Sequence, residues 1–171
     1  MDSLNKQNSL THFIVGASRG IGRSLVDQSI RNGHSVTALA RTSPIEPITG
    51  CNWITGNATE PEAFLDQLPE TINALTFCPG KVILGPIKRL KPEQMLEAYQ
   101  TSVLDAFTLI QALLPRLEGS VVFISSVAAT TGLPSHCAIS AAKSGLEGFA
   151  IALAADLAPK VRVNVVAPTL T

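Results

Sequence analysis

The sequence predicts an α/β fold, a doubly wound parallel sheet of about six strands with helices on both faces. Two observations predict this fold. Six short apolar runs, each the length of a strand, alternate along the chain with longer segments of helical period. The first run, residues 13–15, leads directly into a glycine-rich turn and an amphipathic segment. Right-handed crossovers then place the carboxyl ends of the strands at one edge of the sheet, where such folds bind ligands.

The elements follow in order. The first helix is expected to end at Asn32-Gly33, because glycine is common just past a helix end. Further helices are expected to open at Glu60-Pro61-Glu62 and at Pro92-Glu93, where proline and carboxylates suit a first turn. The later long helices are expected over about 101–117 and from His136 or Cys137 to 157, where the apolar period is helical. The remaining strands are expected at 35–40, 51–55, 72–77, 120–124 and 161–166.

Three glycines give the first turn the pattern G-x-x-x-G-x-G. Gly16 allows a tight turn, Gly20 lets a phosphate approach the backbone, and Gly22 lets the helix pack close to the sheet. A strand, a glycine turn and a helix in this order aim backbone N–H groups at an anion. Taken alone, an ordinary glycine-rich turn between a strand and a helix remains an alternative.

Length and composition indicate one folded domain over residues 11–171, after a loose tail over residues 1–10. Hydrophobic residues are 46% of the 171 and charged residues 15%, which is too apolar for a disordered chain. The 13 basic and 13 acidic residues balance, and the cations form no run, so we expect no nucleic-acid partner. No uninterrupted apolar run approaches the ~20 residues that span a bilayer, so we expect no membrane segment.

The cysteines and histidines indicate neither a metal site nor a disulfide framework. Three cysteines and three histidines are widely spaced and include no C-x-x-C pair. The polar first residues lack the apolar core of a secretory signal. We therefore expect no metal and a cytoplasmic location.

Four stretches in order make the chain similar to the short-chain dehydrogenase/reductase family, over nearly its whole length. They are GASRGIG at 16–22, VVFISS at 121–126, SAAK at 140–143 and VRVNVVAP at 161–168. The resemblance implies a Rossmann-type fold, a nicotinamide cofactor and a small carbonyl or alcohol as substrate. It also implies a homodimer or homotetramer assembled through the two long helices.

The charges around the expected cofactor site favour NADP(H) over NAD(H). An acidic residue at the end of the second strand usually holds the ribose of NAD, but Arg41 stands there, and Arg19 lies inside the glycine turn. Two guanidiniums suit the 2′-phosphate of NADP through charge-assisted bonds, although both could instead be solvated surface groups. The resemblance implies further cofactor contacts at Gly16, Ser18, Gly20, Ile21, Gly22, Asn57, Gly80, Lys143 and Pro168.

Asn57 stands where the family usually has an aspartate near the adenine amino group. Its amide oxygen could still accept that hydrogen bond. The family's Asn-Asn-Ala-Gly at the end of the fourth strand reads Phe-Cys-Pro-Gly at 77–80.

The family's catalytic groups match this sequence only in part. Ser126 matches the serine that polarises the substrate carbonyl, and Lys143 matches the lysine that holds the ribose and lowers the tyrosine pKa. Each has a structural alternative, Ser126 as a turn cap and Lys143 as a surface lysine. The tyrosine position, four residues before Lys143, holds Ile139, and the relay asparagine falls on Ser102. General acid–base help is worth ~10²–10⁴ in rate, which isoleucine cannot supply.

Three other side chains are candidate proton donors or nucleophiles. His136 lies seven residues before Lys143, the spacing that a tyrosine takes in the family's enoyl reductases. Histidine can donate a proton, although a solvated histidine or a helix cap is the more ordinary interpretation. Tyr99 lies on an earlier helix, and Cys137 has no visible activating partner.

These observations leave three hypotheses. The first is an NADP(H)-dependent oxidoreductase whose proton transfer is impaired or altered at Ile139. The second is a non-catalytic NADP(H)-binding relative that acts as a sensor or assembly partner, and the third is an enoyl-reductase-like enzyme that uses His136. The sequence ends soon after Pro168. Either a C-terminal segment is missing from this chain, or the sheet lacks the family's last strand and substrate lid, as we expect.

Overall fold

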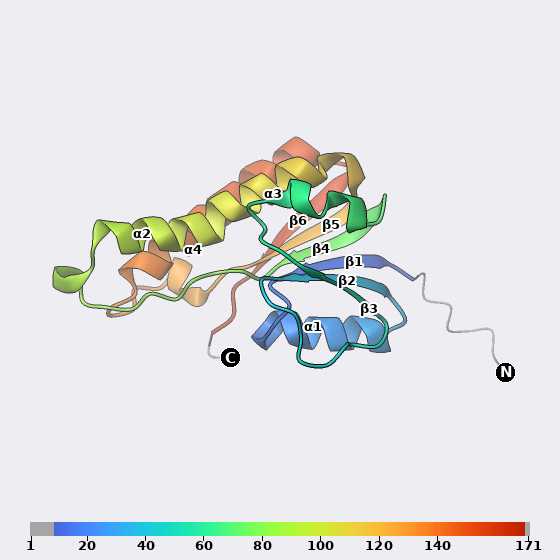
Figure 1. Cartoon of the computed structure of the whole chain (residues 1–171). Helices are drawn as coiled ribbons and strands as arrows, with labels where there is room; N and C mark the ends of the chain where they lie inside the picture. Colours follow the sequence, from blue (N-terminus) through green and yellow to red (C-terminus); the bar gives the residue numbers. More distant parts are fainter. Residues whose placement is uncertain (1–8, 170–171) are drawn as a thin grey trace.

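The computed structural model describes residues 9–169, in which six parallel strands form one sheet (Figure 1). The strand order is β3-β2-β1-β4-β5-β6, which confirms the predicted fold class. Residues 1–8 of the predicted tail lie outside the described part. The strands are β1 Thr11–Val15, β2 Ser35–Ala40, β3 Cys51–Thr55, β4 Ile72–Phe77, β5 Leu117–Ile124 and β6 Val161–Val166.

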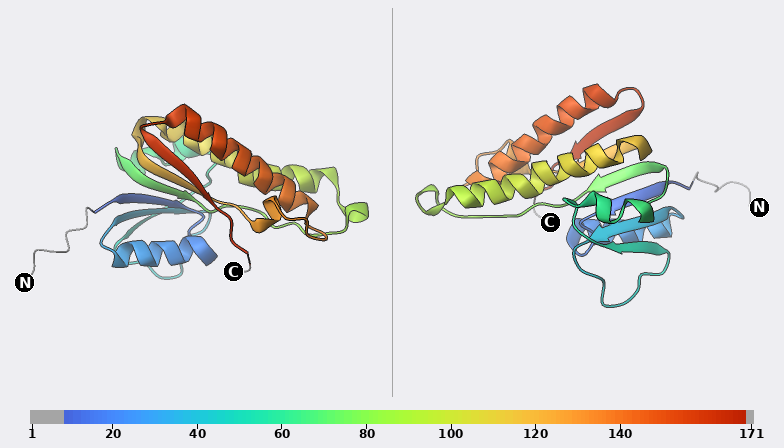
Figure 2. Two further views of the ribbon diagram at one scale, coloured as in Figure 1. Left: turned by 180° about the vertical axis from the view of Figure 1, so that it is seen from behind. Right: turned by 45° about the horizontal axis from the view of Figure 1, so that its top comes forward.

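Helices cover both faces of the sheet, as the doubly wound arrangement requires. Helix α1, Gly20–Arg31, lies on one face. On the other face lie α2 Pro92–Tyr99, α3 Asp105–Leu113 and α4 Cys137–Leu157 (Figures 1 and 2).

The larger core lies between the sheet and α3 and α4. Alternate strand residues point to this face, so Phe13, Phe77 and Phe123 are fully buried there, and Phe77 and Phe123 meet edge to face at 6.2 Å. Their neighbours along the strands, such as Ile14 in β1, belong to a smaller core under α1. Each such side chain contributes about 1.5–3 kcal/mol when buried, so the cores fix where the strand ends lie.

Helix α4 is long and apolar enough to span a membrane by length and composition alone. Its apolar face is used inside the protein, because Ile139, Ala142, Leu146 and Ala150 are buried. The core helix of a folded domain has this same composition.

The helix predicted to open at Glu60 is wrong. The structure has two single 3-10 turns there, Pro61–Ala63 and Leu65–Gln67. Between them Phe64 has φ −144°, which breaks the helical path and accompanies a ring that is 1% exposed. A segment this short gains little from helix propagation, so burial of one aromatic ring decides its conformation.

The prediction for 101–117 is wrong at both ends. Helix α2 runs without interruption through a π-helical turn, Gln100–Leu104, into α3. The helix ends early because Pro115 lacks an N–H group, and a 3-10 turn, Leu114–Arg116, follows. Strand β5 already begins at Leu117, which pairs with Ile72 in β4.

Candidate active site

A cleft of about 1070 Å³ opens at the carboxyl ends of the strands, where the fold class predicts a ligand site. The glycine turn, residues 16–22, forms one wall, and Arg41, Asn57 and Gly80 come from the ends of β2, β3 and β4. The structure thus brings together nine of the predicted cofactor residues. They are Gly16, Ser18, Arg19, Gly20, Ile21, Gly22, Arg41, Asn57 and Gly80.

The glycine turn has the geometry of a phosphate cradle. Gly16 and Gly20 have φ of +80° and +57°, which favour glycine. A Cβ on Gly22 would overlap the carbonyl oxygen of Gly16, so this close approach of turn and helix requires glycine. Helix α1 then starts without a side-chain cap or an acidic residue in its first turn. Its first N–H groups are therefore available to an anion, and the residues present fit a dinucleotide pyrophosphate.

Two arginines lie on this cleft and carry no ion pair among the described residues. Arg19 and Arg41 are both exposed and both line the cleft, beside the hydroxyls of Ser18 and Thr42. The two salt bridges within 9–169 involve other cations, Arg23 and Lys81. The guanidiniums are thus free for an anionic ligand, and the arrangement fits a phosphate dianion.

Asn57 lies on the cleft but already uses its amide oxygen. The Oδ1 atom of Asn57 accepts a hydrogen bond from the backbone N–H of Thr59 at 3.4 Å. This long bond turns the side chain toward its own loop, as asparagine does in Asx turns. Asn57 is therefore a weaker acceptor for a ligand than a free carboxylate would be.

Lys143 is buried, which excludes the surface-lysine alternative. It is 5% exposed, and its Nζ donates to the carbonyl oxygens of Ile124 at 2.7 Å and Pro79 at 3.3 Å. Burial lowers the pKa of Lys143 to about 8. A Cβ on Gly80 would lie 2.8 Å from this Nζ, so the glycine makes room for the ammonium group at the cleft wall.

Ser126 lies two residues beyond Ile124, which lines the cleft. Its Oγ accepts a hydrogen bond from the N–H of Ala128 at 3.2 Å and caps the 3-10 turn Val127–Ala129. The structure therefore shows the turn-cap role. The hydroxyl proton of Ser126 stays available, because this bond uses Oγ only as an acceptor.

Ser102 and Ile139 stand at the positions of the family's relay asparagine and catalytic tyrosine. Ser102 is fully buried in the π-helical turn, and its Oγ has no hydrogen-bond partner within residues 9–169. That Oγ is 3.8 Å from the place where a Cβ on Gly80 would stand, so it faces the same wall as Lys143. Ile139 is 4% exposed and offers no donor.

His136, Pro168, Ser102, Ser126 and Lys143 are not among the side chains that line the cleft. His136 precedes α4, and its Nδ1 lies 2.6 Å from the carbonyl oxygen of Pro134. The carbonyl oxygen of Pro168 accepts from the N–H of Val127 at 3.1 Å, which ties the segment after β6 to the turn after β5.

Comparison with known proteins agrees with this geometry. The family model for short chain dehydrogenase matches residues 56–171. Carbonyl reductase family member 4 of Danio rerio is 30% identical over 174 residues, which cover 92% of this chain and 73% of that protein. The chain belongs to the short-chain dehydrogenase family. It is also 30% identical to the 3-oxoacyl-[acyl-carrier-protein] reductase of Escherichia coli, over 91% of this chain and 71% of the reductase.

Solved structures share the fold. The ligand-free aldohexose dehydrogenase of Thermoplasma acidophilum superposes with a TM-score of 0.84 at 23% identity, over 94% of this chain and 66% of that one. A short chain dehydrogenase from Shigella flexneri, solved in complex with NADP, has a TM-score of 0.83 at 25% identity, over 95% and 77%. Family membership establishes a nicotinamide cofactor and a small-molecule substrate as the coarse function.

Several cleft residues escaped the sequence-based site prediction. Cys78 and Pro79 line the cleft where the family has asparagine and alanine, and burial raises the pKa of the Cys78 thiol to about 12. Gln100, Thr101 and Asp105 also line it from the α2–α3 segment. The π-helical turn Gln100–Leu104 changes the residue spacing here, so an α-helical period did not signal these three residues.

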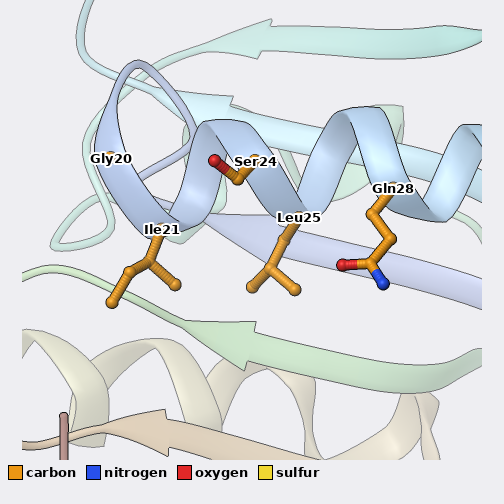
Figure 3. A pocket seen from close by; sticks show the side chains of 5 residues that line it. All are labelled: Gly20, Ile21, Ser24, Leu25 and Gln28. Carbon is orange, nitrogen blue, oxygen red and sulfur yellow. The ribbon is translucent and has the colours of Figure 1, made fainter. Parts of the chain in front are cut away.

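A second hollow, of about 480 Å³, lies along α1 beside the cleft (Figure 3). Ile21, Leu25 and Gln28 point toward it from the helix, and Gly20 and Ser24 complete its lining. It has no ionisable side chain in its lining, so the charged groups that would bind phosphates lie in the cleft.

Proposed function

We propose that this protein is an NADP(H)-dependent oxidoreductase acting on a small carbonyl or alcohol, with proton transfer altered by Ile139. The observation that carries this proposal is the cleft itself. A glycine cradle and two arginines, neither with an ion pair among the described residues, line it, and the buried Lys143 lies behind Gly80 at its wall. The NADP complex of the Shigella flexneri relative supports the choice of cofactor.

Each group has a distinct task in this function. The glycine turn and the start of α1 bind the pyrophosphate, and Arg19 and Arg41 bind the 2′-phosphate. Lys143 holds the nicotinamide ribose, and the hydroxyl of Ser126 donates to the substrate oxygen. The bound cofactor supplies the hydride. Ile139 leaves the substrate oxygen without the usual proton donor, so we expect slow turnover.

A non-catalytic NADP(H)-binding role is the second candidate. It is favoured by the buried isoleucine at the tyrosine position and by the unpartnered Ser102 at the asparagine position. Both changes lie in the catalytic half of the site and leave the cradle intact. An assay of turnover therefore separates the two candidates, whereas cofactor binding alone does not.

The test is a turnover screen with NADPH and a panel of small aldehydes and ketones. The loss of NADPH absorbance measures the reaction. Slow oxidation that depends on the carbonyl, and that Ser126→Ala reduces, supports the oxidoreductase. Saturable NADPH binding without oxidation by any member of the panel supports the binding role. The exposed Ser43→Ala variant is the control, because Ser43 bonds Thr55 outside the cleft.

We also propose that two copies associate through the outer faces of α2, α3 and α4. These faces expose large apolar side chains that no described residue covers. Such patches mark interaction sites more often than chance. They are Leu96, Phe107 and Ile151 on the three helices, with Leu104 and Leu114 in the turns on either side of α3, each 42% or more exposed.

A further inference from the structure

Asp105 places a carboxylate in the wall of the cleft. It is the first residue of α3 and is 9% exposed. Its Oδ1 accepts one hydrogen bond, from Nε2 of Gln100 at 2.9 Å, and no cation pairs with it in the described part of the chain. A carboxylate can accept about four hydrogen bonds, so most of its acceptor capacity is left for a ligand.

Asp105 belongs to the end of the cleft that lies near β3. Helix α3 contacts the 3-10 turn Pro61–Ala63, which follows Asn57 and Thr59 shortly after β3. Asn57 and Thr59 line the same cleft as Asp105. Because Asp105 is the first residue of α3, at the cleft, we infer that its carboxylate lies toward the β3 side of the sheet, whereas Ser126 and Lys143 lie at the β5 side.

A dinucleotide whose pyrophosphate rests on the glycine turn has its adenosine toward β2 and β3. This end is where Arg41 lies, and the nicotinamide end is then beside Lys143. In this orientation Asp105 would lie near the adenine and away from the reacting ring.

The acceptor at Asn57 is weakened, and Asp105 supplies a stronger one. Asn57 is neutral, and its Oδ1 already accepts from the N–H of Thr59. Asp105 carries a negative charge, and Gln100 holds its Oδ1 while the other oxygen keeps its acceptor sites. Hydrogen bonds to charged acceptors are about twice as strong as neutral ones.

We propose that Asp105, oriented by Gln100, accepts a hydrogen bond from the amino group of the adenine and selects adenine over a base with a carbonyl there. The carboxylate repels a carbonyl oxygen, so the preference has both an attractive and a repulsive part. This inference rests on the proposed dinucleotide-binding function.

The experiment is calorimetric titration of the full chain with NADPH and with reduced nicotinamide hypoxanthine dinucleotide phosphate. The second compound replaces the amino group by a carbonyl and keeps every phosphate. We expect the unaltered protein to bind NADPH at least about tenfold more tightly, and Asp105→Asn to lose most of this difference. Asp66→Asn, an exposed acid away from the cleft, is the matched control and should keep the full preference.

Gln100→Met provides a second variant should Asp105→Asn fold poorly. It removes the amide that orients the carboxylate and keeps the side-chain length. We therefore expect its preference for NADPH to be smaller than that of the unaltered protein and larger than that of Asp105→Asn. Equal affinity for both compounds in the unaltered protein, or a preference that neither variant reduces, would overturn the role of Asp105 while leaving cofactor binding intact. Binding of neither compound would overturn the proposed function as well.

Discussion

The two ends of the cleft differ in how completely they are built. At the end formed by β1, β2 and β3, the glycine turn and two arginines without an ion pair in residues 9–169 offer what a dinucleotide phosphate needs. At the end formed by β4 and β5, Lys143 is held by two carbonyl groups, but Ile139 stands one turn before it. The difference teaches that binding and proton transfer are separable here, because the first depends on backbone shape and charge and the second on one side chain.

Restoring the tyrosine should produce the largest effect. We expect Ile139→Tyr to raise carbonyl reduction by ~10²–10⁴, the usual contribution of a general acid, with NADPH affinity unchanged. Initial rates of NADPH oxidation measure it. Ile139→Phe is the matched control, because it adds the ring without the hydroxyl and should give no gain. A gain of equal size in both variants would contradict the missing-donor explanation.

Gly22→Ala should disrupt the glycine turn at the phosphate-binding end of the cleft. The added methyl overlaps the carbonyl oxygen of Gly16, and relief requires the turn to move. We expect a loss of about 3 kcal/mol in the free energy of unfolding and loss of NADPH binding. Urea denaturation and calorimetry measure the two effects. Gly148→Ala meets nothing within 4 Å in a helix interior, so it should be neutral or slightly stabilising.

The burial of Lys143 predicts a dependence of stability on pH. Its pKa is lowered from 10.5 to about 8 by burial. Between these values the unfolded chain keeps a proton that the folded chain has released, so this lysine makes the free energy of unfolding rise with pH, by up to about 3 kcal/mol. Below about pH 8 the lysine is charged in both states, and this contribution to stability is absent.

Urea denaturation of the unaltered protein and of Lys143→Met, between the folded and unfolded pKa values of Lys143, measures the effect. Subtracting the two curves removes the titrations that Lys143 does not affect. The neighbouring Cys78 thiol, with its pKa raised to about 12, acts in the opposite direction and titrates in both proteins. If the free energies of unfolding of the two proteins changed with pH in parallel, Lys143 would be solvated in the folded state.

The smallest effect is expected at Arg41. Arg41→Ala should weaken NADPH binding about tenfold and leave NADH binding unchanged, because only the former has a 2′-phosphate. Competition with 2′,5′-ADP measures the same contact without the nicotinamide. Arg31→Ala, an exposed arginine in the last turn of α1, is the control. Equal losses of affinity for both cofactors would show that Arg41 acts through its positive charge and does not contact the 2′-phosphate.

Much of the fold could be predicted because it follows from local patterns. Short β-branched runs such as 161–166 form strands, and the glycine spacing at 16–22 fixes the first turn. The 3-10 turns at 61–67 could not be predicted, since the burial of Phe64 depends on a core assembled from distant strands.

The same limit explains the residues missed in the site. A π-helical turn spaces residues differently from an α-helix, so it changes which side chains beyond it reach the cleft. Asp105 directly follows that turn, and its place could not be read from an α-helical period. Lys143 was found by its motif, but its burial depends on Gly80 in another loop.

The most direct test of the central claim, that the cleft is an NADP(H) site, is a calorimetric titration of the unaltered chain with NADPH and with NADH. The account predicts saturable binding of one NADPH per chain, at least about tenfold tighter than NADH. Absence of saturable NADPH binding, or equal affinities for the two cofactors, would contradict it.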